Sequence, residues 1–331
     1  MKAPLRRILY VTIFAVVGYG AYAVYSGIGA LGQSLREFSW LAFAAACGLA
    51  LGNYVLRYLK WEFYLARLDI RGVGTVDSLL TFLSGFVLTV TPGKVGEVFK
   101  SWVLFETHGV PVARTAPIVV AERVTDLIGI VTLIVLGSLG FSGGLMWAGI
   151  GGALVVSLLV VIASPSLALG IIALVERIPG RVGRLGPKLH EAYASLATML
   201  RPRNLAVPAL LSVAAWSLEC LALWVILRGF GESTSPPLCV FFYATSTLAG
   251  AVASTPGGLG VTEGALAKQM REVGHVTSGT STAAMMLVRF ATLWFAVLLG
   301  FVALEVLKRR HRVLGGGTEP ITAPRLDAAP P

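Results

Sequence analysis

Long stretches of the chain contain no charged residue, and their lengths predict membrane-spanning helices. The charge-free runs are Ile8–Leu35, Phe38–Leu56, Leu127–Val175 and Ser233–Thr262. A helix needs roughly 20 apolar residues to cross a bilayer, so the run from 127 to 175 is long enough for two crossings, with Ser142-Gly143-Gly144 as its turn. We expect full spans at about 8–28, 38–66, 113–141, 145–164, 204–229 and 279–307.

Two further apolar regions, 75–107 and 237–274, are each interrupted by a Thr-Pro-Gly turn. Val76–Val90 would be about 22 Å long at 1.5 Å per residue, which is short of a hydrocarbon core of roughly 30 Å. We therefore expect each region to enter the membrane, break at mid-depth and turn back. The predicted breaks are at Pro92, Gly93 and Gly96, and at Pro256, Gly257, Gly258 and Gly260.

The two turns belong to an internal repeat. Thr91-Pro92-Gly93-Lys94-Val95-Gly96-Glu97 recurs as Thr255-Pro256-Gly257-Gly258-Leu259-Gly260-Val261-Thr262-Glu263, and an arginine follows each glutamate 26 residues later. Helix breakers and charges at corresponding positions of two halves are typical of transporters with inverted repeats. The predicted fold is an all-α polytopic membrane protein, with about six full spans and two re-entrant helical hairpins in an inverted repeat.

Charge asymmetry orients this arrangement. Re-entrant hairpins place the basic segments at Arg67–Arg71, 177–203 and 308–312 on one side with the amino terminus, and that side is cytoplasmic by the positive-inside rule. We expect a multi-pass inner (plasma) membrane protein with both termini in the cytoplasm. Residues 1–312 form one transmembrane domain, with inverted halves at about 38–141 and 204–307. The loop 165–203 is expected to carry an amphipathic surface helix, and 313–331 to be a disordered tail.

The amino-terminal segment also has features of a signal peptide, because Ala21-Tyr22-Ala23 follows an apolar stretch. We favour an uncleaved first span, and the topology downstream is the same in either case.

Composition narrows the class further. The chain of 331 residues is 56% hydrophobic and 13% charged, whereas a soluble domain has about 25% charged residues. The net charge of +10 fits basic cytoplasmic loops better than nucleic-acid binding. The three cysteines lie apart in apolar segments and the four histidines are isolated, so we expect no metal site and no cofactor.

Charges within spans are costly and usually functional or paired. Glu122, Arg123 and Asp126 lie in the third span, where Glu122 and Asp126 share a helix face and Arg123 reaches Asp126 at i+3. They could form a buried ion-pair network that fixes helix packing, or a polar wall that lines a pathway.

The helix that returns from the first turn carries Lys94, Glu97 and Lys100 at i, i+3 and i+6. Its broken N-terminus would offer free N–H groups to a phosphate, with Lys94 adding a charge. The alternative is a simple turn with lysines that extend to the membrane interface.

Glu263 and Arg289 have no neighbour of opposite charge within four residues. A Glu263–Arg289 pair, mirrored by Glu97–Arg123, is the simplest way to compensate all four charges. Glu219 in the fifth span and Arg57 in the second are further intramembrane charges, although Arg57 could extend to the interface together with Lys60.

At these residues the chain resembles the flippase-like membrane domain of the lysylphosphatidylglycerol synthases. The resemblance rests on Pro92-Gly93-Lys94-x-Gly96-Glu97, Glu122-Arg123-x-x-Asp126 and Pro256-Gly257-Gly258-x-Gly260-x-x-Glu263 followed by Arg289, and covers about residues 38–305. It implies an inner-membrane protein that moves a lipid or lipid-linked headgroup between leaflets, with these positions along the headgroup path. No soluble aminoacyl-transferase domain follows the last expected span, so lipid aminoacylation is not expected.

The leading hypothesis is therefore a lipid translocase and not an enzyme. Its partner would be an anionic or zwitterionic phospholipid or a lipid-linked intermediate, with a possible coupling ion and no nucleic acid. The proposed path residues are Lys94, Glu97, Lys100, Glu122, Arg123, Asp126, Glu219, Glu263 and Arg289. Two alternatives remain: a membrane-embedded enzyme or accessory subunit of lipid-linked biosynthesis that uses Glu122 and Asp126 as acid and base, and an ion-coupled carrier of a small anion.

Overall fold

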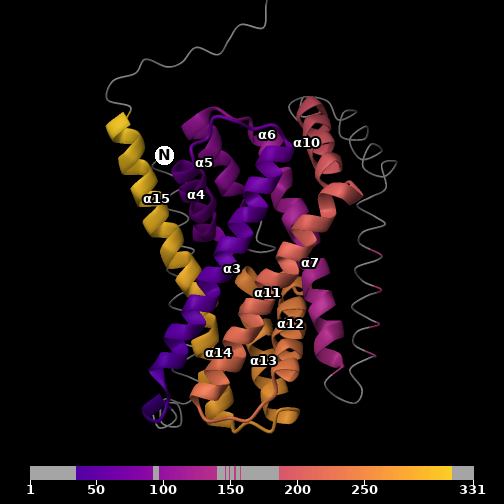
Figure 1. Ribbon diagram of the computed structural model, residues 1–331, viewed down its shortest axis with the longest axis vertical. Helices are drawn as coiled ribbons and strands as arrows, with labels where there is room; N and C mark the ends of the chain where they lie inside the picture. Colours follow the sequence, from indigo (N-terminus) through magenta and orange to yellow (C-terminus); the bar gives the residue numbers. More distant parts are fainter. Residues whose placement is uncertain are drawn as a thin grey trace, which may run out of the picture.

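The structure is a bundle of long helices that run along one axis (Figure 1). The computed structural model describes residues 35–91, 97–139 and 186–314, with four isolated helical positions between 140 and 185. Within these residues every regular element is a helix. The expected spans 8–28 and 145–164, the turn at Pro92–Gly96 with Lys94, and the tail beyond Leu314 lie outside the described residues, apart from the isolated positions.

The described elements follow the order expected from the hydrophobic pattern. They are α3 (Trp40–Arg67), α4 (Thr75–Ser84), the 3₁₀ turn η1 (Gly85–Leu88), α5 (Phe99–His108), α6 (Val112–Thr115), α7 (Pro117–Ser138), α10 (Gly186–Met199), α11 (Pro202–Gly229), α12 (Pro236–Val252), the 3₁₀ turn η4 (Pro256–Gly258), α13 (Val261–Glu272), α14 (Ser278–Arg289), the π-helical turn η5 (Phe290–Trp294) and α15 (Phe295–Leu314).

Three of the described helices are long and apolar enough to cross a membrane: α3, α11 and the continuous segment Ser278–His311. They coincide with the expected spans 38–66, 204–229 and 279–307. Helix α7 matches the expected span 113–141 and has 22 residues, a length of about 33 Å. It differs from the other three in carrying Glu122, Arg123 and Asp126 in its first half.

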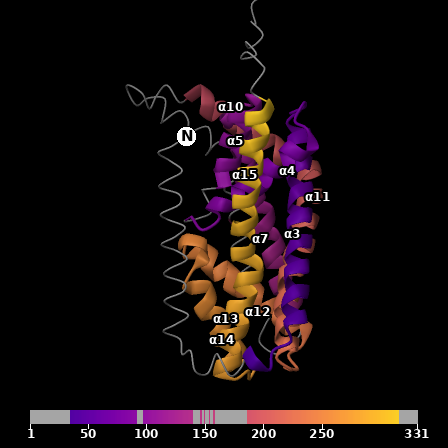
Figure 2. The same cartoon turned by 90° about the vertical axis from the view of Figure 1, so that its left-hand side faces the viewer.

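Both regions with a Thr-Pro-Gly turn are broken helices. We call α4, η1 and α5 the first broken region, and α12, η4 and α13 the second. The first lies toward the upper end of the molecule and the second at the lower end (Figures 1 and 2). In each region the first helix ends partway along the bundle (Figure 1).

The second turn meets the end of the first half of the first broken region. A Cβ atom on Gly257 would lie 3.3 Å from Val90 Cα, so the backbone of the second turn rests against the end of the first. Gly257 and Gly258 have φ values of 63° and 74°, which glycine adopts without the steric cost that other residues incur. The Pro-Gly-Gly sequence therefore serves both the reversal of the chain and the close contact.

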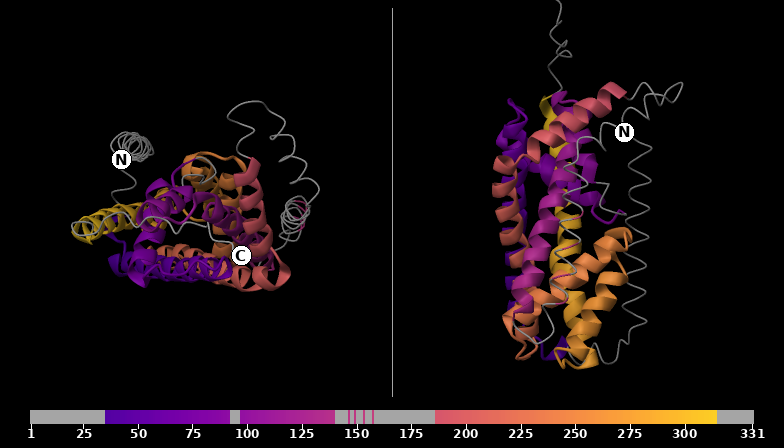
Figure 3. Two further views of the ribbon diagram at one scale, coloured as in Figure 1. Left: turned by 90° about the horizontal axis from the view of Figure 1, so that it is seen from above. Right: turned by 90° about the vertical axis from the view of Figure 1, so that its right-hand side faces the viewer.

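Two layers of helices surround this junction. Helices α3 and α11 lie side by side along one face of the bundle, as the view from above shows (Figure 3). Asn53 of α3 donates a hydrogen bond to the carbonyl of Ala215 on α11 at 2.8 Å. Helix α10, which matches the amphipathic helix expected within 165–203, lies across the upper end with Met199 buried.

Helix α7 packs through glycines. A Cβ atom on Gly129 would lie 3.0 Å from the Ser212 carbonyl carbon of α11, and one on Gly137 would lie 2.8 Å from the Phe241 amide nitrogen of α12. Small residues let helices approach closely where lipid provides no hydrophobic driving force between them. Gly137 thus sets the distance between α7 and the second broken region.

We expect Gly137→Ala to destabilise the protein by about 1–3 kcal/mol, because the new methyl group would push against the backbone of α12. Thermal unfolding in detergent measures the effect. Gly48→Ala on α3 is the matched control, since no atom lies within 4 Å of its added Cβ; it should leave stability unchanged or raise it slightly. Equal effects of the two substitutions would contradict the close-packing argument.

Candidate functional site

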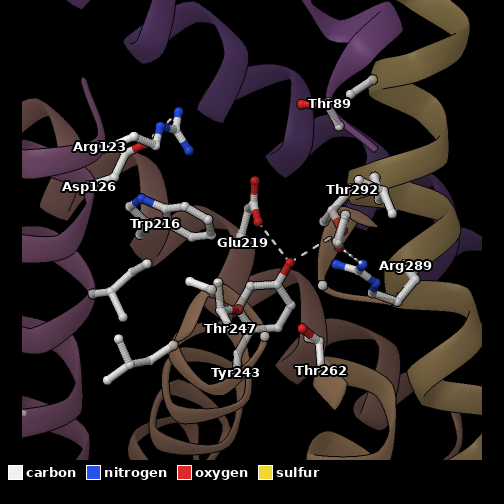
Figure 4. Close-up of a pocket in the computed structure, with 18 of the residues that line it drawn as sticks. Thr89, Arg123, Asp126, Trp216, Glu219, Tyr243, Thr247, Thr262, Arg289 and Thr292 are labelled. Atoms are coloured by element: carbon white, nitrogen blue, oxygen red, sulfur yellow. Dashed lines mark hydrogen bonds and ion pairs between the residues drawn. The ribbon is translucent and has the colours of Figure 1, made fainter. Parts of the chain in front are cut away.

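A cavity of about 310 Å³ lies where the two broken regions meet. Its walls come from α3, α7, α11, α12 and α14 and from both turns. Its charged residues are Arg57, Arg123, Asp126, Glu219 and Arg289. Figure 4 shows Glu219 between Arg123 and Asp126 on one side and Arg289 on the other.

Glu97 orients two of the arginines. It begins the return of the first broken region and is 2% exposed. Arg123 donates a hydrogen bond to its Oε2 at 3.0 Å, and the Arg57 Nη2 atom lies 3.6 Å from the same oxygen. Thr89 donates to the other oxygen, Oε1, at 3.0 Å. Glu97 therefore stands behind the cavity wall and holds two guanidinium groups that line it.

Asp126 links three helices. Lys60 of α3 donates a hydrogen bond to its Oδ1 at 2.6 Å, and Ser212 of α11 donates to the same atom at 3.1 Å. Arg123 lies 3.1 Å from Oδ2, as the i, i+3 spacing predicted.

The expectation that Arg57 and Lys60 could extend to the membrane interface is wrong. Lys60 is 1% exposed and Arg57 is 7% exposed. Because α7 presents Asp126 and the first broken region presents Glu97, both cations find a counter-charge inside the bundle.

Glu122 and Lys100 form a separate buried pair away from the cavity. The Lys100 ammonium donates to Glu122 Oε2 at 2.6 Å and lies 4.7 Å from the centre of the Trp61 ring. Neither residue lines the cavity. This pair fits the packing interpretation of the third-span charges, whereas Arg123 and Asp126 fit the pathway interpretation.

The second broken region has its own pair. Arg289 of α14 donates to Glu263 Oε1 at 2.6 Å and to the carbonyl of Gly257 at 2.8 Å. Glu263 accepts a further hydrogen bond from the Gly260 amide at 2.7 Å, which caps the start of α13. Both pairs expected from the repeat, Glu97–Arg123 and Glu263–Arg289, are therefore confirmed.

Glu219 has a different environment. Tyr243 of α12 donates a hydrogen bond to its Oε2 at 2.7 Å. The same hydroxyl lies 3.3 Å from Thr292 Oγ1, and the Thr292 carbonyl accepts from Tyr54 at 2.6 Å. Among the described residues, no lysine or arginine forms an ion pair with Glu219.

Sequence reasoning missed part of this site. Tyr54, Trp216, Tyr243 and Thr292 line the cavity, but aromatic and hydroxyl residues are ordinary in apolar helices and gave no signal. Lys60 could have been found from the sequence, because it follows Arg57 by three residues on α3, and residues at this spacing share a helix face. Both side chains are buried. Of the predicted path residues, Glu97, Lys100, Glu122 and Glu263 do not line the cavity.

The fold and the site together define a helical membrane protein with a charged cavity between broken helices. The profile of the lysylphosphatidylglycerol synthase TM region matches residues 8–300, and the chain belongs to this family. It is also similar to two proteins of Methanothermobacter thermautotrophicus, each named UPF0104 membrane protein. One is 24% identical over 88% of this chain and 93% of its own length, and the other is 21% identical over 75% and 78%.

We expect Arg289→Gln to destabilise the protein by about 3–5 kcal/mol, because it leaves Glu263 charged and buried without its partner. The double variant Glu263→Gln/Arg289→Gln should recover at least half of this loss, since neither charge remains. Unfolding in detergent measures both, with exposed Arg309→Gln as control. A double variant that is less stable than Arg289→Gln would contradict the pairing argument.

Proposed function

We propose that the protein is a lipid translocase that moves a phospholipid or lipid-linked headgroup between the leaflets of the membrane. The observation that carries this proposal is the cavity at the junction of the two broken regions, where three arginines line one small space. The family to which the chain belongs supports a location in the membrane. The cavity supports the substrate class, because its arginines can bind a phosphate group.

The arginines suit a phosphate group. Arg57, Arg123 and Arg289 come from three different helices and line the same cavity. A guanidinium presents a rigid fork of donors that matches phosphate oxygens and remains charged when it is buried. Because Glu97 and Glu263 hold these groups from behind, the remaining donors are positioned before a headgroup arrives.

The size and walls of the cavity suit a headgroup and not a whole lipid. Its volume of about 310 Å³ is at the lower end of ligand pockets, which are roughly 300–1,000 Å³. Phe86, Ile130, Leu293 and other apolar side chains complete its walls. The acyl chains would stay in the bilayer while the headgroup crosses.

The arrangement of the broken regions supports movement between two sides. They lie toward opposite ends of the bundle (Figure 2), and the second turn meets the first region at Val90, beside the cavity. We infer that they belong to inverted halves, so that rocking of one half against the other exposes the cavity to each leaflet in turn. The basic ends of α3 and α15 both lie at the upper end of Figure 1, which we assign to the cytoplasm.

The ion pairs disfavour the enzyme alternative. An acid and base pair needs side chains that can exchange protons beside the substrate. Glu122 is paired with Lys100 away from the cavity, and Asp126 is held by Lys60, Ser212 and Arg123.

The test uses purified protein in liposomes with fluorescent phosphatidylglycerol or phosphatidylethanolamine, and chemical quenching of the outer leaflet. We expect translocation by the wild type. Arg57→Gln and Glu97→Gln should each reduce the rate more than tenfold, because loss of a charged hydrogen bond costs about 1.5–3 kcal/mol. Arg309→Gln, an exposed change of the same kind, is the control.

Three outcomes would contradict the proposal. No movement of any phospholipid class would exclude a translocase for these lipids. Uptake of inorganic phosphate without lipid movement would select the carrier alternative. A new lipid species, detected by mass spectrometry, would select the enzyme alternative.

A further inference from the structure

Glu219 differs from the other buried carboxylates that the structure describes. Five carboxylates are buried in these residues: Glu97, Glu122, Asp126, Glu219 and Glu263. Four of them lie against a lysine or an arginine. Glu219 instead accepts one hydrogen bond from Tyr243, and its other oxygen points away from Tyr243 into the cavity (Figure 4).

Among the described residues, no cation near Glu219 forms an ion pair with it. The titratable and charged groups that face it are Tyr54 and Arg57 on α3, Arg123 and Asp126 on α7, Tyr243 on α12 and Arg289 on α14, with Cys220 next to it on α11. Each of the three arginines is already bound to another carboxylate. Within the residues that the structure describes, Glu219 therefore has one hydroxyl donor and no direct ion pair, which is little compensation for an ionised carboxylate in a largely apolar wall.

The charges around the cavity indicate what Glu219 could do when an anionic headgroup binds. In the described part, the network contains five cations, Arg57, Lys60, Lys100, Arg123 and Arg289, and the five buried carboxylates. An anionic headgroup would bring a further negative charge beside Glu219, in a space whose described arginines already hold carboxylates. Two negative charges in a space enclosed by apolar helices are costly.

We propose that Glu219 is a proton-binding site, and that its proton enters the cavity together with an anionic phosphate headgroup. This inference rests on the proposed translocase function and adds its energy coupling. A proton from water bonds to the oxygen of Glu219 that faces the cavity, while Tyr243 continues to donate to Oε2. The new O–H group can donate to a phosphate oxygen. When the headgroup leaves, the same O–H bond breaks and the proton returns to water.

The consequence is that headgroup and proton together add no net charge to the cavity. Binding of one therefore favours binding of the other, and the coupling acts equally in both directions. A proton gradient across the membrane would then drive the lipid toward the side of lower proton concentration.

Proton uptake on binding tests the inference without requiring transport. Short-chain phosphatidylglycerol is added to the purified full-length chain in weakly buffered detergent that contains a pH indicator. We expect about one proton to be taken up per headgroup bound by the wild type, and none by Glu219→Gln, whose amide oxygen can still accept from Tyr243. Glu272→Gln, an exposed change of the same kind, should behave as wild type.

The outcomes separate this inference from the proposed function. Lipid binding or translocation with no proton uptake by the wild type overturns the proton site and leaves the translocase standing. Proton uptake that persists in Glu219→Gln also overturns it, because the proton then binds elsewhere. Absence of both lipid binding and translocation overturns the proposed function and this inference with it.

A second variant keeps the inference testable if Glu219→Gln does not fold. Tyr243→Phe removes the hydroxyl that stabilises the ionised carboxylate, so proton binding becomes easier. The pH dependence of translocation in liposomes should therefore shift to higher pH in this variant, relative to a wild-type rate that rises several-fold as the pH is lowered. An unchanged profile, or a wild-type rate that does not vary with pH, would overturn the inference.

Discussion

Charged side chains inside a bundle of apolar helices must find partners, and this constraint organises the structure. Breaking an isolated buried pair costs several kcal/mol, because the remaining charge has neither water nor a counter-ion. The pairs Glu97–Arg123 and Glu263–Arg289 each join a broken region to a neighbouring long helix. These contacts, together with the meeting of Gly257 and Val90, hold the two broken regions in place.

The same constraint explains why the long helices were easy to predict. Apolar segments of span length predict α3, α11 and the segment from α14 to α15, because an apolar helix in lipid has few alternatives. The repeat also gave the two ion pairs, since Glu263 and Arg289 had no local partners and had to pair over distance. The prediction of these pairs depends on the absence of opposite charges near Glu263 and Arg289 in the sequence.

Other parts of the site depend on how the helices pack, which the sequence does not state. Arg57 and Lys60 are residue types that also serve as interfacial anchors, and only the positions of Glu97 and Asp126 show that they turn inward. Tyr243 gave no signal because its hydroxyl matters only where α12 places it beside Glu219. The rotation of each helix likewise decides which carboxylates line the cavity and which do not.

The ion pairs also restrict how the cavity can open. Arg123 ties α7 to the start of α5 through Glu97, and Arg289 ties α14 to η4 and α13 through the Gly257 carbonyl and Glu263. A motion that separated either set would leave charges buried without partners, so each set moves as a unit. The two sets also pack against each other, because Gly257 of the second turn meets Val90 and Gly137 of α7 lies against the backbone of α12. Packing therefore joins the sets where charge does not, and the cavity that Glu219 lines lies at this junction.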